Sequence, residues 1–231
     1  MFKKTVSTFA FLSILTTFYG YNAPSTGAAA ALGTCGGPFG ADLSLLGDGE
    51  YVISAYDNLI RNISEEEGND WRLMSAIAYH ESRFTPDITS RSGARGMMQI
   101  MPSVARQFGV PVSTIADPET NVRLANKLLR KIETMLRLPA GICESDRMSL
   151  VLAAYNGGVG HVADARRLAR SCGENPDSWE VVARYLTLKA EPEYYTKEVV
   201  ECGRFTGSRQ TLAYVSDVMR RYDRYCRMAV R

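Results

Sequence analysis

The stretch "WRLMSAIAYHESRF", Trp71–Phe84, holds a carboxylate where an apolar side chain would be expected. At helical spacing, Trp71, Met74, Ala78 and Glu81 lie on one face. A glutamate is almost never fully buried without a partner, because removing its charge from water is costly. Either the helix ends early enough for Glu81 to reach solvent, or the protein keeps a carboxyl group in a partly apolar place. In the second case desolvation raises its pKa, and the group can serve as a general acid.

Three further short pieces accompany the "HES" of this helix: "GMMQIMPS", "AAYNGG" and "LAYVSDV". In this order and at this spacing, the four pieces resemble the lytic murein transglycosylases that have a goose-type-lysozyme-like (SLT) catalytic domain. The resemblance runs from Trp71 to Tyr222. A more specific resemblance is to the C-terminal domain of membrane-bound lytic transglycosylase F. It rests on the pieces "AIAYHESRF", "LAAYNGGVGHVADAR", "NPDSW" and "YYTKEV".

The resemblance implies that Glu81 is the single catalytic residue, first as acid and then as base. The implied reaction breaks the β-1,4 bond between N-acetylmuramic acid and N-acetylglucosamine without water and forms 1,6-anhydromuramoyl products. Ordinary glycosidases use two carboxylates, whereas the reaction that the resemblance implies needs only one. Three alternatives stay open: a lysozyme-type muramidase on the same fold, a non-catalytic glycan-binding module, and a Glu81 that only pairs with Arg83 or Arg95.

The resemblance also implies a set of substrate-binding residues: Ser82, Gly96, Met98, Gln99, Tyr155, Asn156 and Tyr214. Each has a structural alternative, such as a backbone hydrogen bond for Ser82 or a place in the core for Met98 and Tyr214. The sequence departs from the family where Met97 replaces a leucine, and where Gln210, Thr211 and Leu212 stand for the usual "ETR". The two histidines lie far apart without metal-ligand spacing, so we expect no metal and no cofactor.

The elements that must position these residues are helices. The helical patterns predict one mainly α domain over residues 50–231, and the resemblance implies that this domain is lysozyme-like and has a substrate cleft. Pro102 starts a short helix, and Asp117 caps a long one that has Pro118 in its first turn. "MSLVLAAYN" predicts a central apolar helix, and Ser178 precedes another. The segments Pro192 to Cys202 and Arg209 to Met228 are expected to be the last two helices.

The first residues indicate export. Residues 1–31 have the basic, apolar and small-residue regions of a secretory signal peptide, and residues 32–49 form a Gly-rich arm. Two alternatives are an uncleaved anchor and lipidation at Cys35. We expect the protein in the periplasm or cell envelope of a bacterium, with membrane association left open.

Five cysteines in an exported chain suggest some pairing. Cys143 precedes one expected helix and Cys172 follows the next, so an antiparallel hairpin would bring them together as a disulfide. The alternative is that all five are free.

The charge balance bears on partners. Lys and Arg number 27 against 25 Asp and Glu, and a net charge of +2 gives no argument for nucleic acid. We expect peptidoglycan glycan strands as the partner. The family resemblance includes a solute-binding-like domain that this sequence does not show, so an envelope or secretion complex is a further candidate partner.

Overall fold

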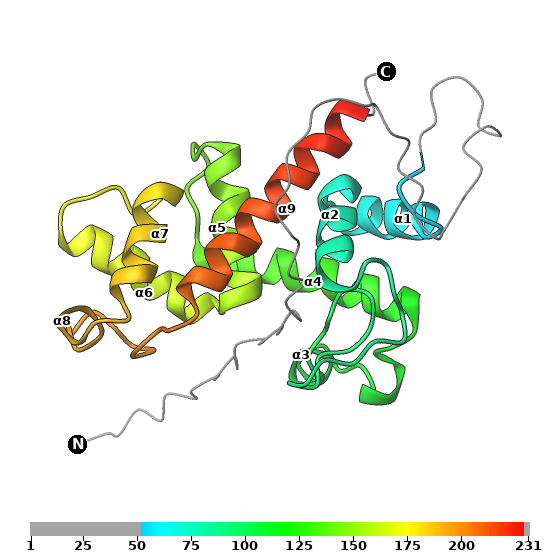
Figure 1. The fold of residues 1–231 in the computed structure, drawn as a ribbon, viewed down its shortest axis with the longest axis horizontal. Helices are drawn as coiled ribbons and strands as arrows, with labels where there is room; N and C mark the ends of the chain where they lie inside the picture. The colour runs from blue at the N-terminus through cyan, green and yellow to red at the C-terminus, as the bar shows by residue number, and fades with distance from the viewer. Residues whose placement is uncertain (1–51, 229–231) are drawn as a thin grey trace, which may run out of the picture.

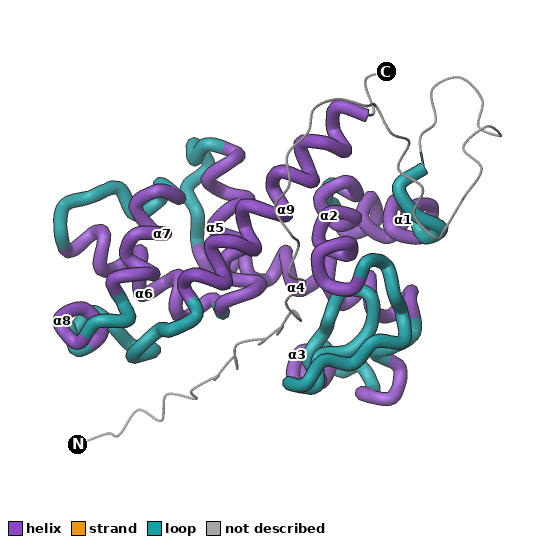
Figure 2. The backbone as a smooth tube through the Cα atoms, in the orientation of Figure 1, coloured by secondary structure: helices purple, strands orange, loops and turns teal. Residues whose placement is uncertain are grey.

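The computed structural model describes residues 52–228, and within that range the named elements are all helical (Figures 1 and 2). This confirms the predicted mainly α class. The elements are α1 (Asp57–Glu67), α2 (Trp71–Ser82), α3 (Pro102–Gln107), the 3-10 helix η2 (Val112–Thr114), α4 (Pro118–Leu136), α5 (Glu144–Gly157), α6 (Val159–Ser171), α7 (Trp179–Leu188), α8 (Pro192–Tyr195) and α9 (Ser208–Met228).

The long helix α9 joins two halves of the molecule. Helices α1, α2 and α4 pack together in one half, and α5, α6 and α7 in the other. Figure 1 shows α9, in red, crossing from the second half to the first. It packs against α5 along one part of its length and against α2 along another. Residues brought by α2, α5 and α9 can therefore meet where these three helices come together.

The helix starts follow the predicted signals. The side chain of Asp70 accepts a hydrogen bond from the Arg72 backbone N–H at 2.8 Å and caps α2. Asp117 caps α4 in the same way, through the Thr120 N–H at 2.9 Å. Pro102 and Pro118 occupy the first position of α3 and α4, where a missing N–H has no cost.

The helices at the centre are buried on more than one face. In α2 every residue from Leu73 to Ala78 is buried. This includes Ser75, which the helical pattern placed off the apolar stripe. Helix α5 is buried from Ser149 to Tyr155, as its apolar sequence predicts. A helix that is apolar nearly all round belongs inside a protein.

The predicted helix from Pro192 to Cys202 is wrong beyond its first turn. Helix α8 ends at Tyr195, and the chain then continues as turns and loop to α9. The backbone here bonds to side chains of α6. The Asp164 carboxylate accepts the N–H groups of Glu201 and Cys202 at 2.9 Å each, and Arg167 donates to the Val199 carbonyl at 2.8 Å. These side-chain bonds take the place of the backbone hydrogen bonds that a helix would form here.

The expected disulfide between Cys143 and Cys172 is not formed in the structure, where both cysteines are free and exposed. Each sulfur faces a local partner. Cys143 lies 3.2 Å from the Ser145 hydroxyl, and Cys172 lies 4.0 Å from that of Ser171. The hairpin of α5 and α6 exists, but its two ends do not direct these side chains at each other.

The signal peptide at 1–31, the arm at 32–49 and Cys35 fall outside the described residues. Across residues 52–228, no helix has both the length and the apolar character needed to span a membrane.

Candidate active site

Glu81 lies in the last turn of α2, where the helix ends in an unusual way. The next two residues, Arg83 and Phe84, both have left-handed backbone angles, with φ of 53° and 61°. The chain therefore turns away directly after Ser82. The Glu81 side chain is only half-buried, yet its Oε1 is shielded from solvent and has no hydrogen-bond partner. The end of the helix thus holds the carboxyl group between the core and the surface.

Burial raises the pKa of the Glu81 carboxyl to about 8, while the nearby Tyr214 hydroxyl partly opposes the shift. The Tyr214 hydroxyl is buried, and its distance and angle to neighbouring groups do not meet the criteria for a hydrogen bond. The ion pair considered for Glu81 is absent among the described residues. Arg83 donates to the Tyr79 hydroxyl at 3.0 Å, and Arg95 donates to the Val112 carbonyl at 3.4 Å. A desolvated carboxyl group that has no cation beside it keeps its proton near neutral pH.

Two tyrosines surround this carboxyl. Tyr155 comes from α5 and Tyr214 from α9, and both are nearly fully buried. Burial and the charge of Glu81 raise the pKa of both phenols, so both stay neutral beside it. The Tyr155 hydroxyl donates to the Met98 carbonyl at 2.8 Å. The Tyr214 ring packs edge-on against His80, with the ring centroids 4.6 Å apart.

The loop Gly96–Gln99 approaches Glu81 from the long connection between α2 and α3, drawn in teal in Figure 2. Gly96 has φ of +77°, and a Cβ there would lie 2.4 Å from the amide nitrogen of Asn121. Only glycine fits such a position. Gln99 also has a left-handed backbone, with φ of 50°. Its amide nitrogen donates back to the Gly96 carbonyl at 2.9 Å and so closes the loop.

Met98 contributes its backbone to the site, and its side chain has the core position that was the structural alternative for this residue. The side chain is fully buried in the core, as is that of Met97. The carbonyls of the two methionines point toward the site instead. That of Met98 accepts the Tyr155 hydroxyl, and that of Met97 accepts the Ser82 hydroxyl at 2.8 Å.

Ser82 and Asn156 serve as ties between elements. The Ser82 hydroxyl links α2 to the loop, and it also accepts the Thr85 N–H at 3.0 Å. This is the backbone-bonding alternative for Ser82. Asn156 accepts a hydrogen bond from the Thr211 hydroxyl at 2.9 Å, which links α5 to α9. Thr211, the middle letter of the altered "QTL" piece, therefore has a structural partner.

Sequence reasoning missed Asn121, which organises the loop. This residue of α4 is fully buried. Its amide nitrogen donates to the carbonyls of Arg95 at 2.9 Å and Ile115 at 2.8 Å, and its oxygen accepts the Met98 N–H at 2.7 Å. The sequence did contain a signal. Asn121 stands four residues before Ala125 and thus continues the apolar stripe of α4 with a polar side chain, the same anomaly that marks Glu81.

The assembled site contains Glu81, the two tyrosines, Ser82 and the Gly96–Gln99 loop, with Asn156 one contact away on the joint of α5 and α9. Its chemistry is that of a single neutral carboxylic acid among neutral hydroxyl and amide groups. Within residues 52–228, no three His, Cys, Asp or Glu side chains gather closely enough to hold a metal ion.

Comparisons with known proteins show what this chain is similar to. A family model described as the transglycosylase SLT domain matches residues 58–177. A membrane-bound lytic murein transglycosylase F from Marinobacter nauticus is 37% identical over 176 residues, covering 75% of this chain and 33% of that protein. Its counterpart from Alcanivorax borkumensis is 39% identical over 171 residues, covering 74% and 35%. The chain therefore spans about one third of these relatives.

Among solved structures, an inactive mutant of the lytic transglycosylase Slt from Pseudomonas aeruginosa superposes with a TM-score of 0.50. The two chains are 24% identical, and the match covers 74% of this chain and 24% of that one. This likeness bears on the fold, and it confirms the expected lysozyme-like helical domain.

Proposed function

The chain belongs to the family defined by the transglycosylase SLT domain, and from this premise we propose that it is a peptidoglycan lytic transglycosylase. In this proposal it cleaves the β-1,4 bond between N-acetylmuramic acid and N-acetylglucosamine and forms 1,6-anhydromuramoyl products. The observation that carries the proposal is the Glu81 carboxyl, which has a raised pKa, a desolvated oxygen and no cationic partner.

In the first step, the protonated Glu81 gives its proton to the glycosidic oxygen, and the bond from that oxygen to the anomeric carbon breaks. The acetamido oxygen of the muramic sugar forms a bond to the same carbon. In this way the substrate supplies the group that a second carboxylate supplies in ordinary glycosidases. The pKa of about 8 supports this step, because an acid must still hold its proton at working pH.

In the second step, the 6-hydroxyl of the muramic sugar attacks the anomeric carbon and displaces the acetamido oxygen. Its proton returns to the Glu81 carboxylate, so the enzyme ends as it began and no water is consumed. The neutral hydroxyl of Tyr214 beside the carboxyl supports this return, since it lowers the cost of the charge that Glu81 carries between the two steps.

The other residues would position the sugar and the acid. The Gln99 amide nitrogen already donates to the Gly96 carbonyl. The Gln99 amide oxygen makes no hydrogen bond to the described residues, so it can accept one from an acetamido or hydroxyl group of the sugar. Gly96 allows the loop to take its tight form. Tyr155, Ser82, Met98 and Asn156 would act on the substrate indirectly, by fixing that loop and the helix ends.

We also infer that the protein works in the bacterial envelope, where peptidoglycan lies. The signal-like residues 1–31 support this, and so do relatives whose names include "membrane-bound". A partner in an envelope or secretion complex is part of the same proposal.

Product analysis tests the proposed function. Purified sacculi are digested with the wild type and with Glu81→Gln, and the fragments are separated and weighed by mass spectrometry. We expect anhydromuropeptides from the wild type and none from the variant. Reducing-end products alone would identify a lysozyme-type hydrolase. Binding of glycan without cleavage by either protein would identify a non-catalytic module.

A further inference from the structure

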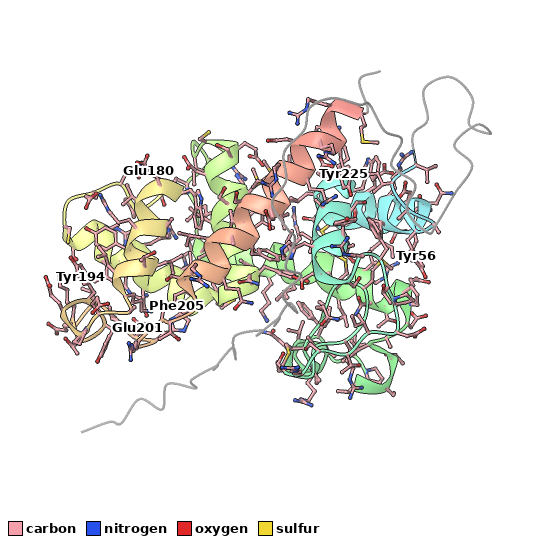
Figure 3. The ribbon with its side chains drawn as sticks, in the orientation of Figure 1. Tyr56, Glu180, Tyr194, Glu201, Phe205 and Tyr225 are labelled. Atoms are coloured by element: carbon pink, nitrogen blue, oxygen red, sulfur yellow. The ribbon has the colours of Figure 1, made fainter. Side chains whose placement is uncertain are left out.

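A concave feature lies beside the site, between the end of α2 and the C-terminal half of α9. The cavity, about 210 Å³, is lined by four arginines: Arg83, Arg220, Arg221 and Arg224. Tyr79, His80 and Asp217 complete the lining. Tyr225, labelled in Figure 3, marks this part of α9. We call this cavity the arginine pocket.

The arginine pocket has a strong excess of positive charge. Four guanidinium groups face the single carboxylate of Asp217. His80 is not a strong further source of positive charge, because burial, with a smaller effect of Arg221, lowers its pKa against the opposing effect of Asp217. The whole chain has a net charge of only +2, so this concentration of arginines is local. Like charges so close together raise the energy of an empty pocket, and an anion would relieve that repulsion.

Part of the pocket is held in place before any ligand arrives. The Arg221 guanidinium stacks 3.4 Å from the centre of the Tyr79 ring, and Arg83 donates to the hydroxyl of the same tyrosine. Arg220 forms an ion pair with Asp217. Arg224 has no ion pair or hydrogen bond among the described residues. Two guanidinium groups that contact the same tyrosine, with a third beside them that has no partner among the described residues, suit a carboxylate, which the planar fork of arginine binds through two hydrogen bonds.

The pocket adjoins the candidate active site through His80. This residue directly precedes Glu81, and its ring contacts the Tyr214 ring that lies against the Glu81 carboxyl. A substrate that reaches Glu81 is therefore only one side chain away from the arginines. The sugar backbone of peptidoglycan is uncharged, because the lactyl carboxyl of muramic acid is used in the amide bond to the stem peptide. The carboxylates of the polymer are on those stem peptides.

We propose that the arginine pocket binds the carboxylates of the peptidoglycan stem peptide, and so makes the enzyme prefer glycan that still carries its stems. This inference rests on the proposed function, since it takes peptidoglycan as the substrate. An anionic membrane surface fits the pocket less well. Proteins bind such surfaces with basic residues that stand beside apolar ones, whereas the lining of this pocket contains no aliphatic side chain and includes a carboxylate.

The test compares two substrates. One is glycan with intact stem peptides. The other, the stripped glycan, is the same material after an amidase has removed the stems and the lactyl carboxyl that this hydrolysis frees on each muramic acid has been coupled to methylamine, so that it carries no charge. We expect wild-type kcat/KM to be about tenfold higher on the intact glycan, the effect of one charge-assisted hydrogen bond. Arg220→Gln with Arg224→Gln should bring the ratio close to one through a higher KM on intact glycan, with the rate on stripped glycan unchanged. Both arginines are exposed, so the double variant should fold.

Arg227→Gln is the control for a loss of positive charge on the same helix, because it removes one arginine charge from an exposed position outside the pocket. It should keep the wild-type ratio. Equal wild-type rates on the two substrates, or equal ratios in the double variant and the control, would overturn the proposal.

A binding experiment separates this proposal from the proposed function. Glu81→Gln, with and without the two pocket substitutions, is sedimented with intact and with stripped glycan. A preference for intact glycan that the pocket substitutions abolish supports the arginine pocket, whatever products the wild type forms. No preference overturns it. The same proteins are also sedimented with vesicles that contain phosphatidylglycerol. Binding to the vesicles that depends on the pocket arginines, together with no preference for intact glycan, would also overturn the proposal.

Discussion

At the scale of single residues, the decisive feature is the protonation of Glu81. A carboxyl group with an ordinary pKa would be ionised at neutral pH, but burial raises the pKa of this one to about 8. The group is therefore a proton donor at pH 7 and loses that ability as the pH rises. The pH dependence of kcat/KM reports the groups of the free enzyme that must be in one protonation state.

We expect kcat/KM on peptidoglycan to fall as the pH rises through about 8, because the fraction of protonated Glu81 falls there. The measurement is initial rates between pH 5 and 10 at constant ionic strength. Glu81→Asp is the informative companion, since a shorter acid should keep a falling limb at a different pH and a lower rate. A profile that falls near the pKa of an ordinary glutamate would show that the carboxyl is solvated in solution.

The sequence predicted Glu81 better than it predicted its neighbours. A charged side chain on an apolar helical stripe is visible in the sequence, and the structure shows its desolvated oxygen. The roles of Ser82 and Met98 depend on which atoms face the site, and this is fixed by loop contacts far away in the chain. Asn121 was missed because its three partners come from two separate loops.

Asn121 gives a second prediction at this scale. Asn121→Ala should destabilise the protein by about 2–4 kcal/mol, because it leaves several buried backbone groups without partners, and it should also lower kcat by releasing the Gly96–Gln99 loop. Urea denaturation and initial rates measure the two effects.

The matched control is Asn126→Ala on the same helix. Asn126 is also fully buried and hydrogen-bonded, but its partners are Val122 and Asn69, away from the loop. It should lose stability and keep its kcat. Equal losses of kcat in both variants would mean that Asn121 has no special influence on the site.

At the scale of elements, the helices with strong local signals were predicted and the segment held by tertiary contacts was not. Caps and prolines marked α3 and α4, and the apolar run marked α5. The segment after α8 has a helical composition, yet Asp164 and Arg167 of α6 bind its backbone and keep it as a loop. No pattern within the segment itself could reveal partners more than thirty residues away.

Asp164 provides the prediction for this scale. It is fully buried, and it forms an ion pair with Lys189, which is also fully buried. Burial alone would raise the pKa of Asp164, but the hydrogen bonds from Lys189 and from two backbone N–H groups lower it below its usual value. Asp164→Asn should cost about 3–5 kcal/mol, because it leaves the Lys189 charge unpaired in the interior.

Urea denaturation checks this value, with Glu119→Gln as the control. Glu119 forms an exposed pair with Arg123 in α4, and its loss should cost less than about 0.5 kcal/mol. Since the folded pKa of Asp164 lies below its unfolded value of 3.8, its contribution is complete above that pH. It is lost as the pH falls further. A wild-type stability that did not decline in this acidic range would contradict the assignment.

At the scale of the whole molecule, the site depends on how α9 joins the two halves. Glu81 comes from α2 in one half, Tyr155 from α5 in the other, and Tyr214 from the helix that packs on both. Helix α5 comes close to α9 at Gly157. A Cβ there would lie 2.9 Å from the Thr211 hydroxyl and 3.1 Å from the Phe205 ring. Neither neighbour can move freely, because both are buried.

Gly157→Ala should therefore push α9 away from α5 and displace Tyr214 from Glu81. We expect a loss of about 1–3 kcal/mol in stability from overpacking, although alanine itself favours a helix. A fall in kcat should accompany this loss, since Tyr214 and the carboxyl would no longer meet. Denaturation curves and initial rates are compared with Gly141→Ala, where a Cβ meets nothing within 4 Å. If Gly157→Ala lost stability but kept its kcat and the fall of kcat/KM at alkaline pH, the contact between α5 and α9 would stabilise the fold without setting the position of the Glu81 carboxyl.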